Sequence, residues 1–316
     1  MKSRKIRLIA LAIAIIAVVP VIAVGGRHKD LYVNAKADEK TADGSANHPY
    51  KTIKKAIEHA DSKTEIHVSK GEYEENITLK KGIKLFGHDK NDTILKAKSS
   101  NKPVVIMDED SEIDDFTVKR GETGIEVKSH AKVLIISCEI SHNKKDGITV
   151  EGGPVKKSND IIISKTDVRK NGQSGIYVEG ARRMVIMNGE ISDNSGDGID
   201  LAAGTSAWIE GNSVKNNSGT GLKATIDGSD IWTKSNSIRK NGREGAEVSF
   251  FGGAGKVDFS KSKIVDNSRY GIARLQRAGY NTSDWNNYLT FNDRSVNAVQ
   301  YWGNAFGNVS PVIFVK

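Results

Sequence analysis

Side chains that could perform acid–base chemistry recur at matching places in a repeated part of the sequence. Asp197 stands directly before a glycine, and Asp200 follows that glycine by two residues. Lys223 holds the place of Asp200 one repeat later, and Glu247 holds it in the repeat after that. Carboxylates beside a lysine could bind Ca²⁺ and the carboxylate of a uronate, with the lysine removing a proton in β-elimination. The alternative is a ladder of alternating charges on a solvated sheet, in which each ion pair contributes little to stability.

These residues belong to a phrase that occurs six times between residues 140 and 272. It reads Ile or Val, two residues, Asn, three residues, Gly and an apolar residue, and its asparagines are Asn143, Asn171, Asn194, Asn217, Asn241 and Asn267. The offset from Asn to Gly is always four, whereas successive glycines lie 23 to 28 residues apart. A constant phrase with variable spacers is typical of one structural unit stacked on copies of itself, with length changes in loops.

Around each phrase apolar residues alternate with polar ones, which is the period of a β-strand. Three short strands in each unit cannot bury their apolar faces alone, but stacking the units about 4.8 Å apart creates a continuous core. Connections between parallel strands are overwhelmingly right-handed. We therefore predict an all-β fold, a single-stranded right-handed parallel β-helix. We expect the asparagines to adopt left-handed backbone angles in the turns and to hydrogen-bond along the stack.

The ends of such a solenoid need caps, because they present unpaired strand edges. Residues 50–60 carry apolar side chains at helical spacing and predict an N-terminal capping helix before a first strand at residues 64–68. We assign residues 29–278 to the β-helix with this cap. Residues 279–316 lack the phrase and are rich in aromatic residues and asparagine, so we predict a loop-rich C-terminal cap of the same domain.

Two outward-facing rows of side chains are candidate binding surfaces. The first row, two residues after each glycine, contains Tyr177 beside the charged residues, and we predict that Tyr177 and Glu247 contact a substrate. The second row, nine residues before each Asn, is apolar and includes Trp208 and Trp232. An exposed apolar stripe usually marks a ligand or partner surface, and the flat rings of Trp suit the C–H faces of sugars. The alternatives are that another segment or subunit covers the stripe, or that the local register shifts by one residue.

Several segments resemble the pectate-lyase-like right-handed β-helix repeat proteins. The start of that family is similar to Leu31-Tyr-Val-Asn, to the run from Pro49 to Ile57 and to Gly82-Ile-Lys-Leu-Phe-Gly87. The ending from Gly307 to Val315 is similar to the C-terminal strand of some members. The resemblance covers residues 31–316 and implies the β-helix fold and a link to carbohydrates. It implies no single activity, because the superfamily contains lyases, hydrolases, epimerases, adhesins and members with no known reaction.

Ser195-Gly-Asp197-Gly-Ile-Asp200 is also similar to the Asn-Thr-Asp-Gly-Ile-Asp segment of polygalacturonases, with both aspartates matching. The next unit reads Ser218-Gly-Thr-Gly221 where those enzymes carry an aspartate pair, and their Gly-His-Gly segment has no counterpart with histidine. Inverting hydrolysis needs both an acid and a base across the scissile bond. If the protein is an enzyme, we therefore expect a polysaccharide lyase or epimerase rather than a hydrolase, with Asp197, Asp200 and Lys223 as catalytic residues.

Residues 1–28 combine a basic start with a 17-residue apolar run at residues 8–24, which is typical of a secretory signal. The segment Val21-Ile-Ala23 suits cleavage after Ala23, yet the run is also close to the shortest membrane span. A cleaved signal peptide and a retained anchor both stay open. We expect a secreted or cell-surface protein whose contact with the membrane is confined to this segment.

The charge and cysteine content restrict the partners. The formal net charge is +8, but the residues up to Arg27 contribute five Lys and Arg and no acid, which leaves 42 basic and 39 acidic residues. No basic stripe with interleaved aromatic residues occurs, so nucleic-acid binding is not expected. Cys138 is the single cysteine and cannot form an intramolecular disulfide. We predict a protein that binds, and could modify, polysaccharide; a lyase or epimerase acting on acidic glycans and a non-catalytic scaffold or adhesin with a protein partner are the alternatives.

Overall fold

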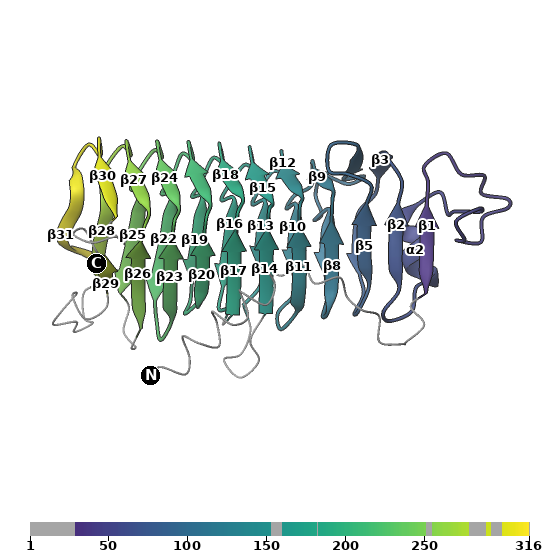
Figure 1. Cartoon of the computed structure of the whole chain (residues 1–316), viewed down its shortest axis with the longest axis horizontal. Helices are drawn as coiled ribbons and strands as arrows, with labels where there is room; N and C mark the ends of the chain where they lie inside the picture. Colours follow the sequence, from purple (N-terminus) through teal and green to yellow (C-terminus); the bar gives the residue numbers. More distant parts are fainter. Residues whose placement is uncertain are drawn as a thin grey trace.

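The computed structural model describes residues 29–152, 160–181, 183–250, 255–277, 289–291 and 299–315. The described chain winds into an elongated solenoid whose strands form three parallel sheets (Figure 1). Each complete unit contributes one strand to every sheet, so strands that are neighbours in a sheet belong to successive units. The predicted parallel β-helix is confirmed.

We name the sheets A, B and C in the order in which a unit passes through them. Sheet A contains β1 (Asp30–Val33), β2 (Glu65–Val68), β5 (Lys84–Gly87), β8 (Ser111–Asp114), β11 (Lys132–Ile136), β14 (Asp160–Ser164), β17 (Arg183–Met187), β20 (Ala207–Glu210), β23 (Asp230–Lys234), β26 (Lys256–Ser260) and β29 (Leu289–Phe291). Sheet B contains β3 (Gly71–Glu74), β6 (Thr93–Lys96), β9 (Thr117–Lys119), β12 (Glu139–Ser141), β15 (Asp167–Arg169), β18 (Glu190–Ser192), β21 (Ser213–Lys215), β24 (Ser237–Arg239), β27 (Lys263–Val265) and β30 (Gln300–Trp302). Sheet C contains β4 (Ile77–Leu79), β7 (Val105–Met107), β10 (Ile125–Val127), β13 (Ile148–Val150), β16 (Ile176–Glu179), β19 (Ile199–Ala202), β22 (Leu222–Ile226), β25 (Ala246–Phe250), β28 (Tyr270–Arg277) and β31 (Gly307–Val315).

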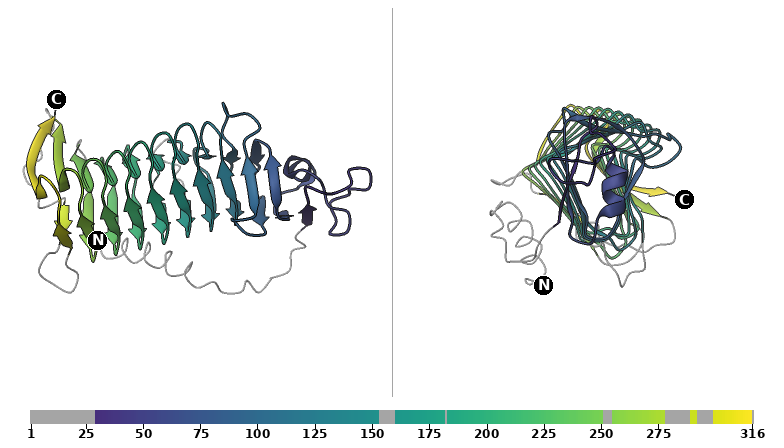
Figure 2. Two further views of the ribbon diagram at one scale, coloured as in Figure 1. Left: turned by 90° about the horizontal axis from the view of Figure 1, so that it is seen from above. Right: turned by 90° about the vertical axis from the view of Figure 1, so that its right-hand side faces the viewer.

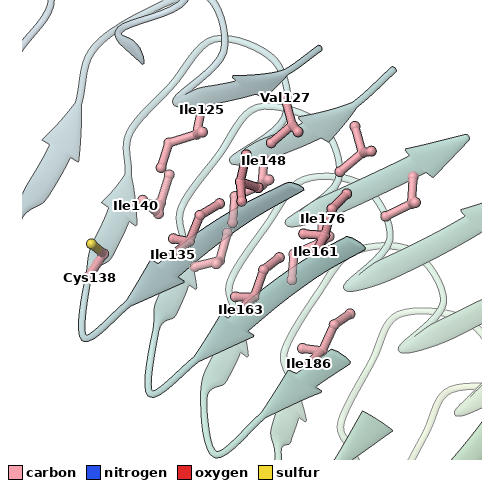
Figure 3. Close-up of a cluster of buried hydrophobic side chains, with 14 of the residues drawn as sticks. Ile125, Val127, Ile135, Cys138, Ile140, Ile148, Ile161, Ile163, Ile176 and Ile186 are labelled. Atoms are coloured by element: carbon pink, nitrogen blue, oxygen red, sulfur yellow. The ribbon is translucent and has the colours of Figure 1, made fainter. Parts of the chain in front are cut away.

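The core consists of columns of like side chains from successive units. Ile125, Ile148 and Ile176 are register partners in sheet C and are all fully buried. Figure 3 shows them inside the coil, opposite a second column from sheet A that includes Ile135 and Ile163. Because alternate residues of each strand point inward, the residues between them form outward rows that run along the solenoid.

The six repeated asparagines lie in one buried column at the turn between sheets B and C. Asn143 Nδ2 donates to Asn171 Oδ1 (2.9 Å), and Asn171 Nδ2 donates to Asn194 Oδ1 (3.0 Å). The same bond links each later pair, and a further asparagine, Asn304, accepts from Asn267 Nδ2 (2.9 Å). Asn304 escaped the sequence pattern because its unit keeps the spacing but changes the residue types: Tyr301 stands in the place of the Ile or Val, and Asn308 stands in the place of the glycine.

The expectation that these asparagines adopt left-handed backbone angles is wrong. The residue directly before each of them does so, with φ near 55°, and these residues are His142, Lys170, Asp193, Asn216, Lys240 and Asp266. Each asparagine uses its backbone N–H as well as its side chain in the ladder; the N–H of Asn171, for example, donates to Asn194 Oδ1 (3.0 Å). The left-handed strain therefore falls on the preceding, exposed residue, whose side chain has no role in the buried column.

The repeated glycines allow close packing and do not supply a left-handed turn. A Cβ at Gly221 would lie 2.5 Å from Ile238 Cγ2 and 2.7 Å from Asn241 Nδ2. Those two atoms belong to the next unit. The glycine column is therefore the contact that lets the Asn column and the apolar column stack at the spacing of parallel strands.

The N-terminal end is covered by α2 (Ile53–His59), which lies within the predicted helical segment and across the end of the solenoid in Figure 2. Thr52 Oγ1 accepts from Lys55 N (3.2 Å) as the N-cap, and Ile53, Ala56 and Ile57 are buried. The prediction that the first strand begins near residue 64 is wrong, because β1 precedes the helix and pairs with β2. β1 carries no copy of the repeated phrase, so periodicity could not reveal it.

At the C-terminal end the described residues extend the solenoid by a strand in each sheet. β29, β30 and β31 pair in parallel with β26, β27 and β28. This part of the segment predicted to be a loop-rich cap is therefore strand, while the predicted boundary at residues 278–279 lies outside the described residues. Residues 1–28, with the predicted signal or anchor, also lie outside them. Within the described residues no helix has the length and apolar character needed to span a membrane.

Candidate functional site

The outward row of sheet C brings four of the predicted site residues together. Tyr177, Asp200, Lys223 and Glu247 are successive register partners in β16, β19, β22 and β25. Each lies between inward-pointing apolar neighbours, which holds its Cβ on the outer face. The order predicted from the spacing of the glycines is therefore confirmed, and successive side chains are separated by about 4.8 Å, the strand spacing.

Lys223 is the centre of this charged group. Its Nζ lies 3.1 Å from Asp200 Oδ2, to which it donates a hydrogen bond, and 3.8 Å from Asp197 Oδ2. Asp200 and Glu247 are both more than nine-tenths buried, whereas about a third of the Lys223 side chain is exposed. The ammonium group is thus the part of the cluster that solvent reaches most easily.

Burial raises the pKa of Asp200 and of Glu247, although the positive charge of Lys223 partly opposes that rise. Burial alone would lower the pKa of Lys223, but the charges of Asp200, Asp197 and Glu247 outweigh it and raise that pKa above its ordinary value. A general base must lose its proton near the operating pH. Lys223 therefore stays an ammonium group at neutral pH, which favours a cationic binding or bracing role over proton abstraction.

One carboxylate oxygen of Asp197 is bonded to the backbone of the next unit. Its Oδ1 accepts from the backbone N–H of Thr220 in the next unit (2.7 Å). Asp146, two units earlier, accepts from the backbone N–H of Ser174 in the same way (2.8 Å), although the lysine next to it, Lys145, pairs with Glu122. The repetition of this bond indicates a structural role for Asp197, and one carboxylate oxygen is left to face Lys223.

A surface cavity of about 530 Å³ adjoins this row at its N-terminal side. Tyr177 and Thr149 from the outward row line it, together with Glu151, Glu179 and the backbone around Gly180. Glu151 and Glu179 are exposed. Neither glutamate was predicted from the sequence, although each stands four residues after a repeated glycine. Glu179 is the last residue of β16, and Glu151 directly follows β13.

The cavity and the row beside it are predominantly negative. Burial and the charges of Glu179, Asp200 and Asp146 raise the pKa of the Tyr177 hydroxyl. Burial and the charges of Glu151 and Glu122 raise the pKa of Glu126, which precedes Thr149 in the same row. Lys223 is the single cation of the row between Glu126 and Glu247.

The arrangement does not fit the Ca²⁺ site considered from the sequence. Ca²⁺ takes six to eight oxygen ligands, whereas the Lys223 ammonium lies between the carboxylates of Asp197 and Asp200. Among the described residues, the group of three acidic or histidine side chains whose ligand atoms converge is Asp30, Glu65 and His67, at the far N-terminal end. No step of a reaction is therefore assigned to a metal here.

The tryptophans lie on a different face. Trp208 and Trp232 are register partners in β20 and β23 of sheet A, with ring centroids 6.5 Å apart and ring planes tilted by 33°. Both are half-buried, and Trp208 Nε1 donates to Glu210 Oε2 (2.8 Å). They point outward as predicted, but they share no surface with Tyr177 and Glu247, so the predicted substrate-binding residues do not form one site.

The apolar stripe before the tryptophans is not exposed along its whole length. Ile162 and Val185 are at most 8% exposed and form, with Met187, an apolar cluster separate from the main core. Trp208 and Leu134 pack against this cluster. The exposed part of the stripe is therefore limited to its two ends.

Comparisons with known proteins agree with this architecture. Residues 123–293, more than half of the chain, match the family described as the right-handed β-helix region, and residues 36–94 match a family described as a protein of unknown function (DUF1565). No sequence among the curated proteins matches the chain.

Two solved structures share the fold. Pectate lyase Pel9A aligns over 91% of this chain and 79% of its own, with 13% identity and a TM-score of 0.56. XylC in complex with xylose aligns over 78% of this chain and 67% of its own, with 12% identity and a TM-score of 0.63. At such identities the likeness concerns the fold. With three parallel sheets, a stacked asparagine column and a matching family over most of the coil, the chain belongs to the right-handed β-helix family.

Proposed function

We propose that the protein binds a polysaccharide on the outer face of sheet C, at the cavity beside Tyr177. The observation that carries the proposal is the combination of this cavity of about 530 Å³ with a partly exposed aromatic ring and a row of hydrogen-bonding side chains. Ligand sites are concave and combine apolar surface with a few polar groups that orient the ligand. The ring of Tyr177 supplies the apolar surface, and Thr149, Glu151 and Glu179 supply polar atoms.

The negative charge of this face indicates which class of glycan it can bind. Carboxylates outnumber the single lysine, and like charges brought together across an interface cost free energy. A polyuronate would place further carboxylates beside Glu151, Glu179 and Asp200. The face suits a neutral glycan, or one that carries free amino groups, better than the acidic glycan expected of a lyase or epimerase.

The protonated state of Lys223 points in the same direction. β-Elimination from a uronate needs a base that is free of its proton, and the neighbouring carboxylates hold the proton on Lys223. We therefore favour binding without lyase chemistry. One neighbour in fold is named as a pectate lyase and another holds xylose, which supports a polysaccharide as the class of ligand.

We further propose that the protein acts outside the cytoplasm. The support for this is the basic and apolar sequence of residues 1–28. A location in the cell wall or outer medium would place the solenoid in contact with polysaccharide.

Isothermal titration calorimetry with xylohexaose and with the glucosamine hexamer tests the binding site. Both should bind, and the cationic glucosamine hexamer should bind more tightly at low ionic strength. Tyr177→Ala should weaken both by at least about tenfold, which corresponds to about 1.4 kcal/mol, because aromatic residues at the centre of an interface carry much of its binding energy. The galacturonate hexamer should not displace xylohexaose.

Trp232→Ala is the matched control, since it removes a half-buried aromatic ring from the outer face of sheet A. It should bind both hexamers as the unaltered protein does. Equal binding by Tyr177→Ala and the unaltered protein would contradict the proposal. Formation of unsaturated uronate from polygalacturonate that is lost in Lys223→Ala would instead establish a lyase.

A second candidate function is binding to a partner through sheet A. The specific observation is that Trp208 and Trp232 face outward side by side and remain partly exposed. If this surface is the functional one, Trp232→Ala abolishes glycan or partner binding and Tyr177→Ala does not. The same pair of variants therefore separates the two candidates.

A further inference from the structure

A group of basic side chains lies on sheet B and on the turn that follows it. Lys119, Ser141 and Arg169 are register partners in β9, β12 and β15. The next residues, Arg120, His142 and Lys170, all have left-handed backbone angles, with φ of 67°, 57° and 55°, and all three are exposed. The common conformation projects these side chains from the same place in three successive units, so we call Lys119, Arg120, His142, Arg169 and Lys170 the basic patch.

Negative charge offsets the two cations of the basic patch that lie on sheet B, but not the two cations of its turn. Arg169 pairs with Glu139 (2.5 Å), and Lys119 lies at the limit of an ion pair with Glu72 (4.0 Å). Within the described part of the chain, the side chains of Arg120 and Lys170 form no ion pair. Elsewhere the outward cations alternate with acids on neighbouring units, as in the contacts of Lys234 with Glu210 and of Lys128 with Asp108.

The pKa of His142, which lies between the cations of the patch, reflects their positive charge. Partial burial and the charges of Lys170, Arg169 and Arg120 lower the pKa of this histidine, and the opposing effect of Glu139 does not restore it. The imidazole is therefore neutral near pH 7. It can donate or accept a hydrogen bond between the two flanking cations without adding to their repulsion.

The spacing of the basic patch follows from the coil. Lys119 and Arg169 are separated by two unit spacings, or about 9.6 Å from the strand spacing of about 4.8 Å. Arg120 and Lys170 repeat that separation beside them. The cations thus form two short parallel lines along the solenoid axis. The buried Asn column lies between these lines and the negative face of sheet C.

We propose that the basic patch binds a linear acidic polysaccharide that runs along the solenoid axis. Successive carboxylates of the polymer would contact Arg120 and Lys170 in the turn. They would also contact Lys119 and Arg169 on sheet B. Arginine is suited to two-pronged contact with carboxylates. The patch contains no Phe, Tyr or Trp on which a nucleic-acid base could stack, which favours an acidic polysaccharide over a single-stranded nucleic acid.

This surface is separate from the proposed glycan site on sheet C, and the two have opposite charge. A ligand could therefore occupy one surface without the other. An acidic polymer held at the basic patch would keep the protein on an anionic matrix while the face of sheet C remained accessible to a neutral or amino glycan.

The test uses polygalacturonate and its fully methyl-esterified form, which has the same backbone without the charge. Binding of each fluorescently labelled polymer is measured by anisotropy between 20 and 300 mM salt. The unaltered protein should bind polygalacturonate, with an affinity that falls as salt rises, and should bind the ester at least about tenfold more weakly.

The charge-reversal variant Arg120→Glu/Lys170→Glu should weaken polygalacturonate binding by at least about tenfold and flatten its salt dependence. The control Lys40→Glu/Lys70→Glu reverses two exposed lysines near the N-terminal end. It makes the same change in net charge and should bind as the unaltered protein does. Circular dichroism confirms that both variants fold.

Three results would overturn the proposal: equal binding of polygalacturonate and its ester, equal binding by the patch variant and the control, or tighter binding of single-stranded DNA than of polygalacturonate at the same salt concentration. Tyr177→Ala should leave polygalacturonate binding unchanged. Failure of the glycan site on sheet C and failure of the basic patch are therefore distinguished by different variants and different polymers.

Discussion

At the scale of single residues, Lys223 decides the chemistry of the candidate site. It lies beside Asp200 and Asp197 and directly before Glu247 in the row, and these carboxylates raise its pKa. A lysine that serves as a base needs a lowered pKa, which comes from desolvation or from neighbouring cations. At Lys223 the neighbouring carboxylates outweigh desolvation, so the lysine stays charged and neutralises part of the buried negative charge.

Lys223→Met should therefore destabilise the fold near pH 7, because it leaves Asp200 and Glu247 buried without their cation. Breaking a fully buried pair costs about 3–5 kcal/mol, but Lys223 is about a third exposed. Solvent screening reduces the expected loss in the free energy of unfolding to about 1–2 kcal/mol. Urea denaturation at pH 7 and pH 5 measures it.

The loss should shrink at pH 5, where the two carboxyl groups with raised pKa values become more protonated. The double variant Lys223→Met/Asp200→Asn should recover part of the stability. A loss that stays constant with pH and is not recovered in the double variant would show that packing, and not charge, explains the effect.

Asn217 shows how a single buried amide links its own unit to the units on both sides. Its Nδ2 donates to Asn241 Oδ1 and to Ile191 O (both 3.1 Å), and its Oδ1 accepts from the Nδ2 and the backbone N–H of Asn194. Removing these groups leaves several buried donors and acceptors without partners, at about 1–3 kcal/mol each.

Asn217→Ala should therefore lower the free energy of unfolding by about 3–5 kcal/mol, measured by chemical denaturation. Asn216→Gly is the control, because Asn216 is exposed, has a left-handed φ of 56° and takes no part in the ladder. Glycine accepts that conformation, so the control should change stability by less than about 1 kcal/mol. Similar losses in both variants would contradict the ladder as the source of stability.

At the scale of elements, the three sheets separate candidate site residues that lie close together in the sequence. β20 and β23 present the tryptophans on sheet A, while β16, β19, β22 and β25 present Tyr177 and the charged row on sheet C. A unit of about 23 residues visits both sheets, so residues close in sequence lie on different faces. The sequence order alone therefore gives no measure of whether two side chains share a site.

The two tryptophans should differ in their effect on stability. Trp208 packs against the cluster of Ile162, Val185 and Met187 and donates a hydrogen bond to Glu210, whereas Trp232 lies beyond it. We expect Trp208→Ala to lower the free energy of unfolding by about 2–3 kcal/mol, less than the 3–5 kcal/mol of a core residue.

We expect Trp232→Ala to cost about 1 kcal/mol or less, because this ring does not pack against the apolar cluster and so loses fewer contacts. Thermal unfolding of the two single variants, followed by circular dichroism, measures the difference. A larger loss in Trp232→Ala than in Trp208→Ala would show that the outer ring is the better packed one.

At the scale of the whole molecule, the solenoid collects partly buried carboxyl groups on its outer rows. Burial raises the pKa of Glu75, Glu112, Asp146, Asp200 and Glu247. A carboxyl group whose pKa is raised by folding binds its proton more tightly in the folded chain. Its protonation therefore adds stability as the pH falls through the raised value, and the gain is complete below the value in the unfolded chain.

The folded protein should accordingly become more stable as the pH falls from about 7 to about 5. The carboxyl groups with lowered pKa values, such as Asp108 and Glu109, act in the opposite sense, but they lose their contribution only at lower pH, from near their ordinary values of 3.8 and 4.5 downwards. His142, whose pKa is also lowered, opposes the gain within the range, but it is one group against the five carboxyl groups. Thermal unfolding across this range measures the effect. Asp200→Asn/Glu247→Gln should reduce the pH dependence, and a midpoint that falls steadily from pH 7 to 5 would contradict the prediction.

Export is the other property of the whole chain that can be tested. Fractionation of cells that express the full sequence should place the protein outside the cytoplasm, because residues 1–28 have the pattern of a secretory signal. Mass spectrometry of the mature N-terminus distinguishes cleavage after Ala23 from a retained anchor. Recovery of the full-length chain in the soluble cytoplasmic fraction would overturn the expectation.

The sequence by itself determined the fold and the register of its repeated part. The columns of Ile125, Ile148 and Ile176 and of Asn143 to Asn267 were predictable, because burial selects one residue type at each inward position and the stacking repeats that selection in every unit. β1 and Asn304 were not predictable from the phrase, since β1 carries no copy of it and the unit of Asn304 has other residues in the places of the Ile or Val and of the glycine. The left-handed position was assigned one residue too late, because the hydrogen-bonding needs of the Asn backbone become visible only when the next unit is in place.

The composition of the candidate site was decided by the tertiary structure. The sequence indicated that Asp200, Lys223 and Glu247 would be neighbours, but the sign of the pKa shift on Lys223 depends on burial and on distances between atoms about 23 residues apart in the chain. The same is true of the cavity beside Tyr177, the separation of the tryptophans from it, and the basic patch around His142. The residue type at an inward position is selected by burial, which the sequence pattern reveals. The charge of an outer face depends on side chains from several units, and only the folded coil brings these together.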